Sequence, residues 1–191
     1  MPNIYLEALP QDIQSRLQEI SENLHGDCSS AEIAGFAEDL EAFRGRFPDN
    51  AFLLNLYAGV CYFQKETRRA DDLVRTCYSL QPEYLPAKLG YAHLLLEEGD
   101  LDKIPAVFNG KFVLSEVYPE RKVFHITEVI KFSMFLAEFF FLRGEIQHAQ
   151  VQLDFLKQIA PDFPGTKQIE TLLHPPQGLL ANIMRKIGLM G

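Results

Sequence analysis

Residues 51–84 read AFLLNLYAGVCYFQKETRRADDLVRTCYSLQPEY. In this stretch Ala58 is followed 12 residues later by Ala70, and 12 residues after that by Pro82. The same spacing recurs further along the chain, at Ala137, Ala149 and Pro161. Two antiparallel helices approach closely where small side chains meet, and alanine has the highest helix propensity. Because proline cannot continue a helical hydrogen-bond ladder, it ends the second helix. The spacing therefore predicts pairs of antiparallel helices.

A weaker copy of the pattern follows the first one with a period of 34 residues. Ala92 lies 34 residues after Ala58, whereas Ile104 takes the place of the second alanine and the final proline is missing. Turns between paired helices favour glycine followed by a polar residue, and Gly99-Asp100 and Gly144-Glu145 fall at the expected turns. The sequence thus predicts three helix pairs in one frame.

A 34-residue period with small residues in both helices, a glycine turn and a terminal proline resembles the tetratricopeptide repeat (TPR) family. The resemblance implies an all-α fold, in which antiparallel helix pairs form a right-handed superhelix with a C-terminal capping helix. It places one array over residues 1–174, with repeats at about 12–50, 51–84, 85–118 and 130–163 and a cap at 165–174. Residues 175–191 are predicted to be a linker and a short amphipathic helix.

The sequence departs from the family pattern at three places. It contains no tryptophan, and Cys61 replaces the usual aromatic residue of a first helix. Ala92 and Ala137 lie 45 residues apart, so about 11 extra residues separate the third and fourth repeats. That insertion includes the polar sequence 119–122, and a longer helix from about 123 to 142 is expected after it.

The first and last helices are predicted from their own patterns. Residues 12–24 carry a helical apolar stripe. Ser29 and Glu32 form an S-x-x-E capping box, which predicts a second helix from about Ser30 to just before Pro48. At the C-terminal end one helical face carries four apolar residues, at Leu180, Ile183, Met184 and Ile187.

The composition excludes several classes of protein. Eighteen basic and 26 acidic residues give a net charge of -8, so nucleic-acid binding is not expected. The three cysteines form no CxxC motif, which favours a reducing compartment, and no signal peptide is recognised. The most apolar stretch, 132–142, is too short to span a bilayer about 30 Å thick. These features predict a cytoplasmic protein.

No arrangement of residues in the sequence indicates catalysis or a cofactor. Glu145 and His148 share one helical face, but a metal-binding helical bundle needs further carboxylates, so this pair is interpreted as a surface contact. Cys61 and Cys77 are expected to fill the core, and Cys28 to lie on a loop. We therefore expect no enzyme activity, no metal and no cofactor.

The resemblance implies that the first helix of each repeat lines a concave groove. Helical spacing selects eight groove residues there, in addition to Gly59: Asn55, Tyr62, Leu89, His93, Leu96, Met134, Glu138 and Phe141. Lysines and asparagines that clamp a peptide carboxylate are common in the family, and only Asn55 fits that role. An apolar helix or extended peptide is therefore the expected guest. Packing between repeats is the alternative for each of these residues.

The sequence thus predicts a non-catalytic protein–protein interaction module or adaptor that binds a protein or peptide partner. Two alternatives remain open. One is a small chaperone of a secretion-system component. The other is a membrane-peripheral assembly factor anchored by the C-terminal amphipathic helix, although the acidic net charge of the chain argues against membrane binding. The C-terminal helix could also dock on its own chain, or form a homodimer with a second copy.

Overall fold

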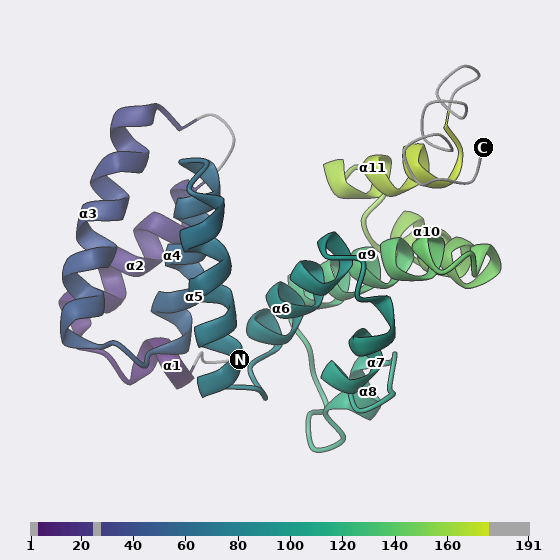
Figure 1. The fold of residues 1–191 in the computed structure, drawn as a ribbon, viewed down its shortest axis with the longest axis horizontal. Coiled ribbons are helices and arrows are strands. Elements are labelled where there is room, and N and C mark those ends of the chain that lie inside the picture. Colours follow the sequence, from purple (N-terminus) through teal and green to yellow (C-terminus); the bar gives the residue numbers. More distant parts are fainter. Residues whose placement is uncertain (1–3, 25–27, 176–191) are drawn as a thin grey trace. The chain divides into compact units, whose positions relative to one another are not determined.

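The computed structural model describes residues 4–24 and 28–175, and every regular element within them is a helix (Figure 1). The predicted all-α class is therefore confirmed for these residues. The chain divides into two compact units, the first ending at Asp100 and the second beginning at Leu101. The amphipathic helix predicted within 175–191 lies outside the described residues.

The first unit contains six helices in the described residues. These are α1 (Ile4–Glu7), α2 (Gln11–Asn23), α3 (Ser30–Arg46), α4 (Ala51–Phe63), α5 (Thr67–Leu80) and α6 (Leu85–Glu97). The apolar stripe of α2 is buried as predicted. The predicted capping box begins α3, because the Ser29 hydroxyl accepts from the Glu32 N–H while the Glu32 carboxylate accepts from the Ser29 N–H. Helix α1 was not predicted, since four residues are too few to show a helical pattern.

Helices α4 and α5 form the closest pair of the first unit. Ala58 and Ala70 are 2% and 0% exposed, which confirms the predicted close approach. Helix α5 ends at Gln81, where the chain turns through Pro82 before α6 begins. The acidic residues after the prolines do not cap the next helix. The residue that caps α4 with its side chain is Asn50, which accepts from the Leu53 N–H at 3.0 Å.

The second unit also contains six helical elements in the described residues. These are the 3-10 turn η1 (Leu101–Lys103) and the α-helices α7 (Ile104–Val107), α8 (Leu114–Val117), α9 (Ile126–Leu142), α10 (Ile146–Ile159) and α11 (Pro164–Leu173). Ala137 and Ala149 are both fully buried between α9 and α10, as predicted. Helix α9 begins at Ile126 rather than near residue 123, because His125 and Glu128 form a capping box there.

Residues 85–118 do not form the expected helix pair. They contain one long helix, α6, followed by the short elements η1, α7 and α8. Pro105 restricts α7 to a new helix start, and Asn109 and Gly110 end it with φ angles of 54° and 71°. The segment is instead anchored on α9 by aromatic packing, as in the 5.5 Å contact between the rings of Phe108 and Phe132.

Helix α11 caps the second unit where the sequence predicted a cap. Ile169 of α11 packs with Leu153 and Leu156 of α10, and all three side chains are buried. The cap is also held at its surface, where Lys157 and Glu170 form an ion pair with 2.5 Å between Nζ and Oε1. The apolar edge of α10 that the sequence analysis left open is therefore covered by α11.

Candidate protein-binding surface

One backbone turn occurs three times, and it fixes which helical positions are equivalent. Lys65, Gly99 and Gly144 each adopt a positive φ, of 63°, 77° and 75°. Their N–H groups donate to the carbonyls three residues earlier, at Tyr62, Leu96 and Phe141. The next N–H in each turn donates five residues back. This is the hydrogen-bond pattern with which many helices end, so Tyr62, Leu96 and Phe141 occupy the same place in α4, α6 and α9.

Tyr62 is the most exposed of the candidate residues on α4. Its side chain is 40% exposed, and its hydroxyl donates to the Asp71 carboxylate of α5 at 2.8 Å. Burial and this hydrogen bond raise the pKa of the Tyr62 hydroxyl. Asn55, two turns earlier on the same face, is half-buried. The contact with Asp71 fixes the ring of Tyr62 while leaving part of it accessible to a partner.

Helix α6 contributes the other candidates of the first unit, and it packs against both α4 and α5. Leu89 is buried, Leu96 is half-buried and His93 is exposed. Leu89 is thus an element of packing, whereas Leu96 and His93 remain accessible on α6.

Helix α9 carries the candidates that belong to the second unit. Met134 packs on α11, and a Cβ added to Gly165 would lie only 2.5 Å from the Met134 sulfur. For Met134 the alternative of packing between helices is therefore correct. Glu138 and Phe141 are half-buried, and burial raises the pKa of the Glu138 carboxyl. The structure places five candidates on the first unit and three on the second, and each group is described separately.

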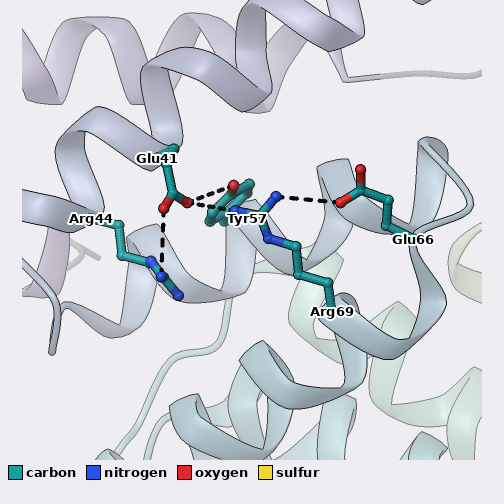
Figure 2. A network of polar contacts seen from close by, with 5 residues as sticks. All are labelled: Glu41, Arg44, Tyr57, Glu66 and Arg69. Atoms are coloured by element: carbon teal, nitrogen blue, oxygen red, sulfur yellow. Dashed lines mark hydrogen bonds and ion pairs between the residues drawn. The ribbon is translucent and has the colours of Figure 1, made fainter.

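A polar network in the first unit was not predicted (Figure 2). Glu41 of α3 accepts hydrogen bonds at 2.7 Å from the Tyr57 hydroxyl of α4 and from Arg69 Nη2 of α5. Arg69 also pairs with Glu66 at 3.4 Å, and its guanidinium lies 4.8 Å from the centre of the Tyr57 ring. Arg44 of α3 reaches Glu41 at 3.6 Å.

The network joins three helices around a tyrosine ring that is only 1% exposed. The hydrogen bond from Tyr57, followed by the nearby Arg44 and Arg69 charges, lowers the pKa of the Glu41 carboxyl. No local motif signals this arrangement, because its members come from three helices and meet only after folding. Glu41, Arg44 and Thr76 also line a shallow hollow of about 410 Å³.

The residues considered for chemistry lie where packing or solvent explains them. Cys61 and Cys77 are buried and free, and burial raises the pKa of the Cys77 thiol to about 12. Cys28 is half-buried beside α2, where its thiol donates to the Asn23 carbonyl at 2.6 Å. His148 and Glu145 meet at 2.9 Å as an exposed pair.

Two further findings concern only residues 4–24 and 28–175. No group of three or more histidine, cysteine, aspartate or glutamate side chains in this part of the chain could hold a metal ion. None of its helices combines the length and the hydropathy that crossing a membrane requires.

Comparison with known proteins finds no matching family model, no similar curated protein and no similar solved structure.

Proposed function

We propose that this chain is a non-catalytic interaction module whose helix pairs form a right-handed superhelix of the TPR type, and that it works in the cytoplasm. In this proposal the first helices of the pairs bind an apolar helix or an extended apolar peptide of a partner protein. The turns at Lys65, Gly99 and Gly144 support the repeat frame, because they recur with the same hydrogen bonds.

One observation carries the proposal. The position before each repeated turn holds an aromatic or aliphatic side chain that is not fully buried, at Tyr62, Leu96 and Phe141. A core position would be closed to solvent, and an ordinary surface position of a soluble helix is usually polar. Large side chains that recur at one accessible position are typical of a surface that contacts another molecule.

The chemistry of these positions indicates the kind of guest. None of the three side chains is charged, and the Tyr62 hydroxyl is already bonded to Asp71. A guest would therefore gain mainly from burying apolar surface against the tyrosine ring, since the carboxylate that could pair with a basic residue is engaged. An amphipathic helix or an apolar extended segment meets this requirement.

The test is affinity capture from the native host with three baits: the unaltered protein, Tyr62→Ala and Phe63→Ala. Tyr62 and Phe63 are neighbours on α4 with similar exposure, 40% and 43%, but they project about 100° apart around the helix. The partner found with the unaltered protein is then purified, and its affinity for each bait is measured by calorimetry.

Tyr62→Ala should weaken partner binding about tenfold or more, as expected for an aromatic anchor. Phe63→Ala should leave the affinity within about twofold, because small surface changes outside a contact are nearly neutral. Equal affinities for all three baits would show that the partner binds elsewhere, and equal losses would point to the end of α4 as a whole rather than to the predicted face.

A further inference from the structure

The outer face of α10 differs from the equivalent face of α5. Val151 and Phe155 are 61% and 38% exposed, and they lie four residues apart on one side of α10. The repeat frame, which aligns Ala149 with Ala70, aligns these two residues with Asp72 and Thr76 of α5. Both of those are exposed and polar, so apolar surface is found on α10 where α5 presents polar side chains.

The end of α11 brings the following chain to this face. His174, the residue directly after α11, has its Nε2 atom 2.8 Å from the Gln150 side-chain oxygen of α10. Gln150 precedes Val151, so the described chain stops beside the exposed apolar pair. Five residues separate Pro175 from Leu180, and an extended chain of that length reaches about 16 Å.

The remaining sequence complements this face. Residues 177–191 contain apolar side chains at the i, i+3, i+4 and i+7 positions of a helical stripe, from Leu180 to Ile187. They also contain Arg185 and Lys186 and no acidic residue. Asp154 lies between Val151 and Phe155 in sequence and accepts a hydrogen bond from Gln150 at 2.8 Å. The segment therefore offers apolar surface and positive charge to a face that carries apolar surface and a carboxylate.

We propose that residues 177–191 dock on α10 of their own chain and cover Val151 and Phe155. The stripe from Leu180 to Ile187 supplies the apolar contact. The short connection from Pro175 favours docking within one chain, because the segment is held beside its site at a high effective concentration. This inference concerns a face of α10 and does not depend on the binding surface proposed for α4.

A double-mutant cycle in the full chain tests the contact, with Val151→Ser and Ile183→Ser alone and together. Each single change should raise the unfolding equilibrium constant about fivefold. The double variant should fall short of the product of the two factors by more than about twofold, because residues in contact are not additive. Val113→Ser is the matched control, since Val113 is 52% exposed elsewhere on the second unit. Combined with Ile183→Ser, it should give the simple product.

A second measurement does not depend on unfolding. The thiol introduced by Val151→Cys should react several-fold faster with a thiol reagent when Ile183→Ser is also present, with peptide mapping used to separate it from the native cysteines. Multiplicative effects for both pairs, with unchanged thiol reactivity, would overturn the proposal. It would also be overturned if light scattering showed that Ile183→Ser halves the mass of the particle, because the occupant would then be a second copy of the chain.

Discussion

Helix α5 and residues 101–118 occupy the same position in the repeat frame, yet only the first forms a full helix. Helix α5 runs for 14 residues from Thr67 to Leu80, whereas α7 has four. The difference lies in residues between the signature positions. Pro105 stands where α5 has Asp71, and the pair Asn109-Gly110 stands where α5 has Arg75 and Thr76. A repeat signature thus fixes where helices meet, while helix-breaking residues decide whether the second helix forms.

The two segments also use their shared inward position differently. Ala70 lets α5 approach α4 closely, and Ile104 is likewise fully buried although no long helix surrounds it. The larger side chain fills space that a continuous helix would otherwise occupy. The predictions below test this contrast, and they run from the largest expected effect to the smallest.

Ile104→Ala should destabilise the second unit by about 2–5 kcal/mol, because it removes buried methyl groups and leaves a cavity. If residues 101–118 tolerated the alanine of an ordinary repeat at this position, the loss would be far smaller. Urea unfolding followed by circular dichroism measures the change. Val113→Ala, at a position that is 52% exposed, is the control and should shift stability by about 0.5 kcal/mol or less.

Ala137→Leu should cost about 1–3 kcal/mol, because it overfills a close contact between two complete helices. Ala42 on α3 is exposed, so Ala42→Leu adds the same atoms without a clash and should be nearly neutral. The two urea midpoints are compared directly. Similar midpoints for the two variants would mean that the alanine position is not a close contact between helices.

The repeated turn offers a paired test with opposite signs. Gly144→Ala should destabilise by about 1 kcal/mol, because alanine disfavours the left-handed backbone that Gly144 adopts. Lys65 has the same conformation without being glycine, so Lys65→Gly should stabilise by about 0.5 kcal/mol. Thermal unfolding of both variants measures the two shifts, and shifts of the same sign would contradict the equivalence of the turns.

The polar network predicts a small, pH-dependent effect. The pKa of Glu41 lies below its usual value of 4.5, chiefly because its carboxylate accepts from Tyr57. A lowered folded pKa contributes stability above about pH 4.5, and that stability is lost as the pH falls through the folded value. Glu41 is almost half exposed, so Tyr57→Phe should cost only about 0.5–1 kcal/mol at pH 7.

Unfolding at pH 7 and near pH 3 checks this prediction. The difference between the unaltered protein and Tyr57→Phe should shrink at the lower pH, because the protonated carboxyl no longer accepts the same charged hydrogen bond. A difference that stays constant across this range would indicate that the tyrosine hydroxyl acts through packing instead.

Much of the fold could be predicted because its signals are local. The alanines, the prolines and the Ser29–Glu32 capping box each act within a few residues, and the structure places them as expected. Gly99 and Gly144 were found for the same reason. Lys65 was missed as the third member of the turn, because nothing in a lysine residue indicates a positive φ.

The features that were missed depend on contacts between distant residues. The Glu41 network joins α3 to α4 and α5, and the packing of Met134 on Gly165 joins α9 to α11. Helical spacing identified the face of α9 that carries Met134, but it could not show which neighbour covers that face. The candidate surface was therefore predicted position by position, while the accessibility of each side chain required the structure.

The first helix has a consequence for the order in which the first unit can fold. Tyr5 in α1 donates to Gln81, 76 residues away, at 3.1 Å, and its ring packs 4.7 Å from the ring of Tyr84. The pairing of α4 with α5, by contrast, closes loops of only a few residues. Because long loops cost more entropy to close than short ones, the contact order is low within the helix pair and high at the N-terminus. On a ribosome, the residues made first are therefore among the last of this unit to find their places.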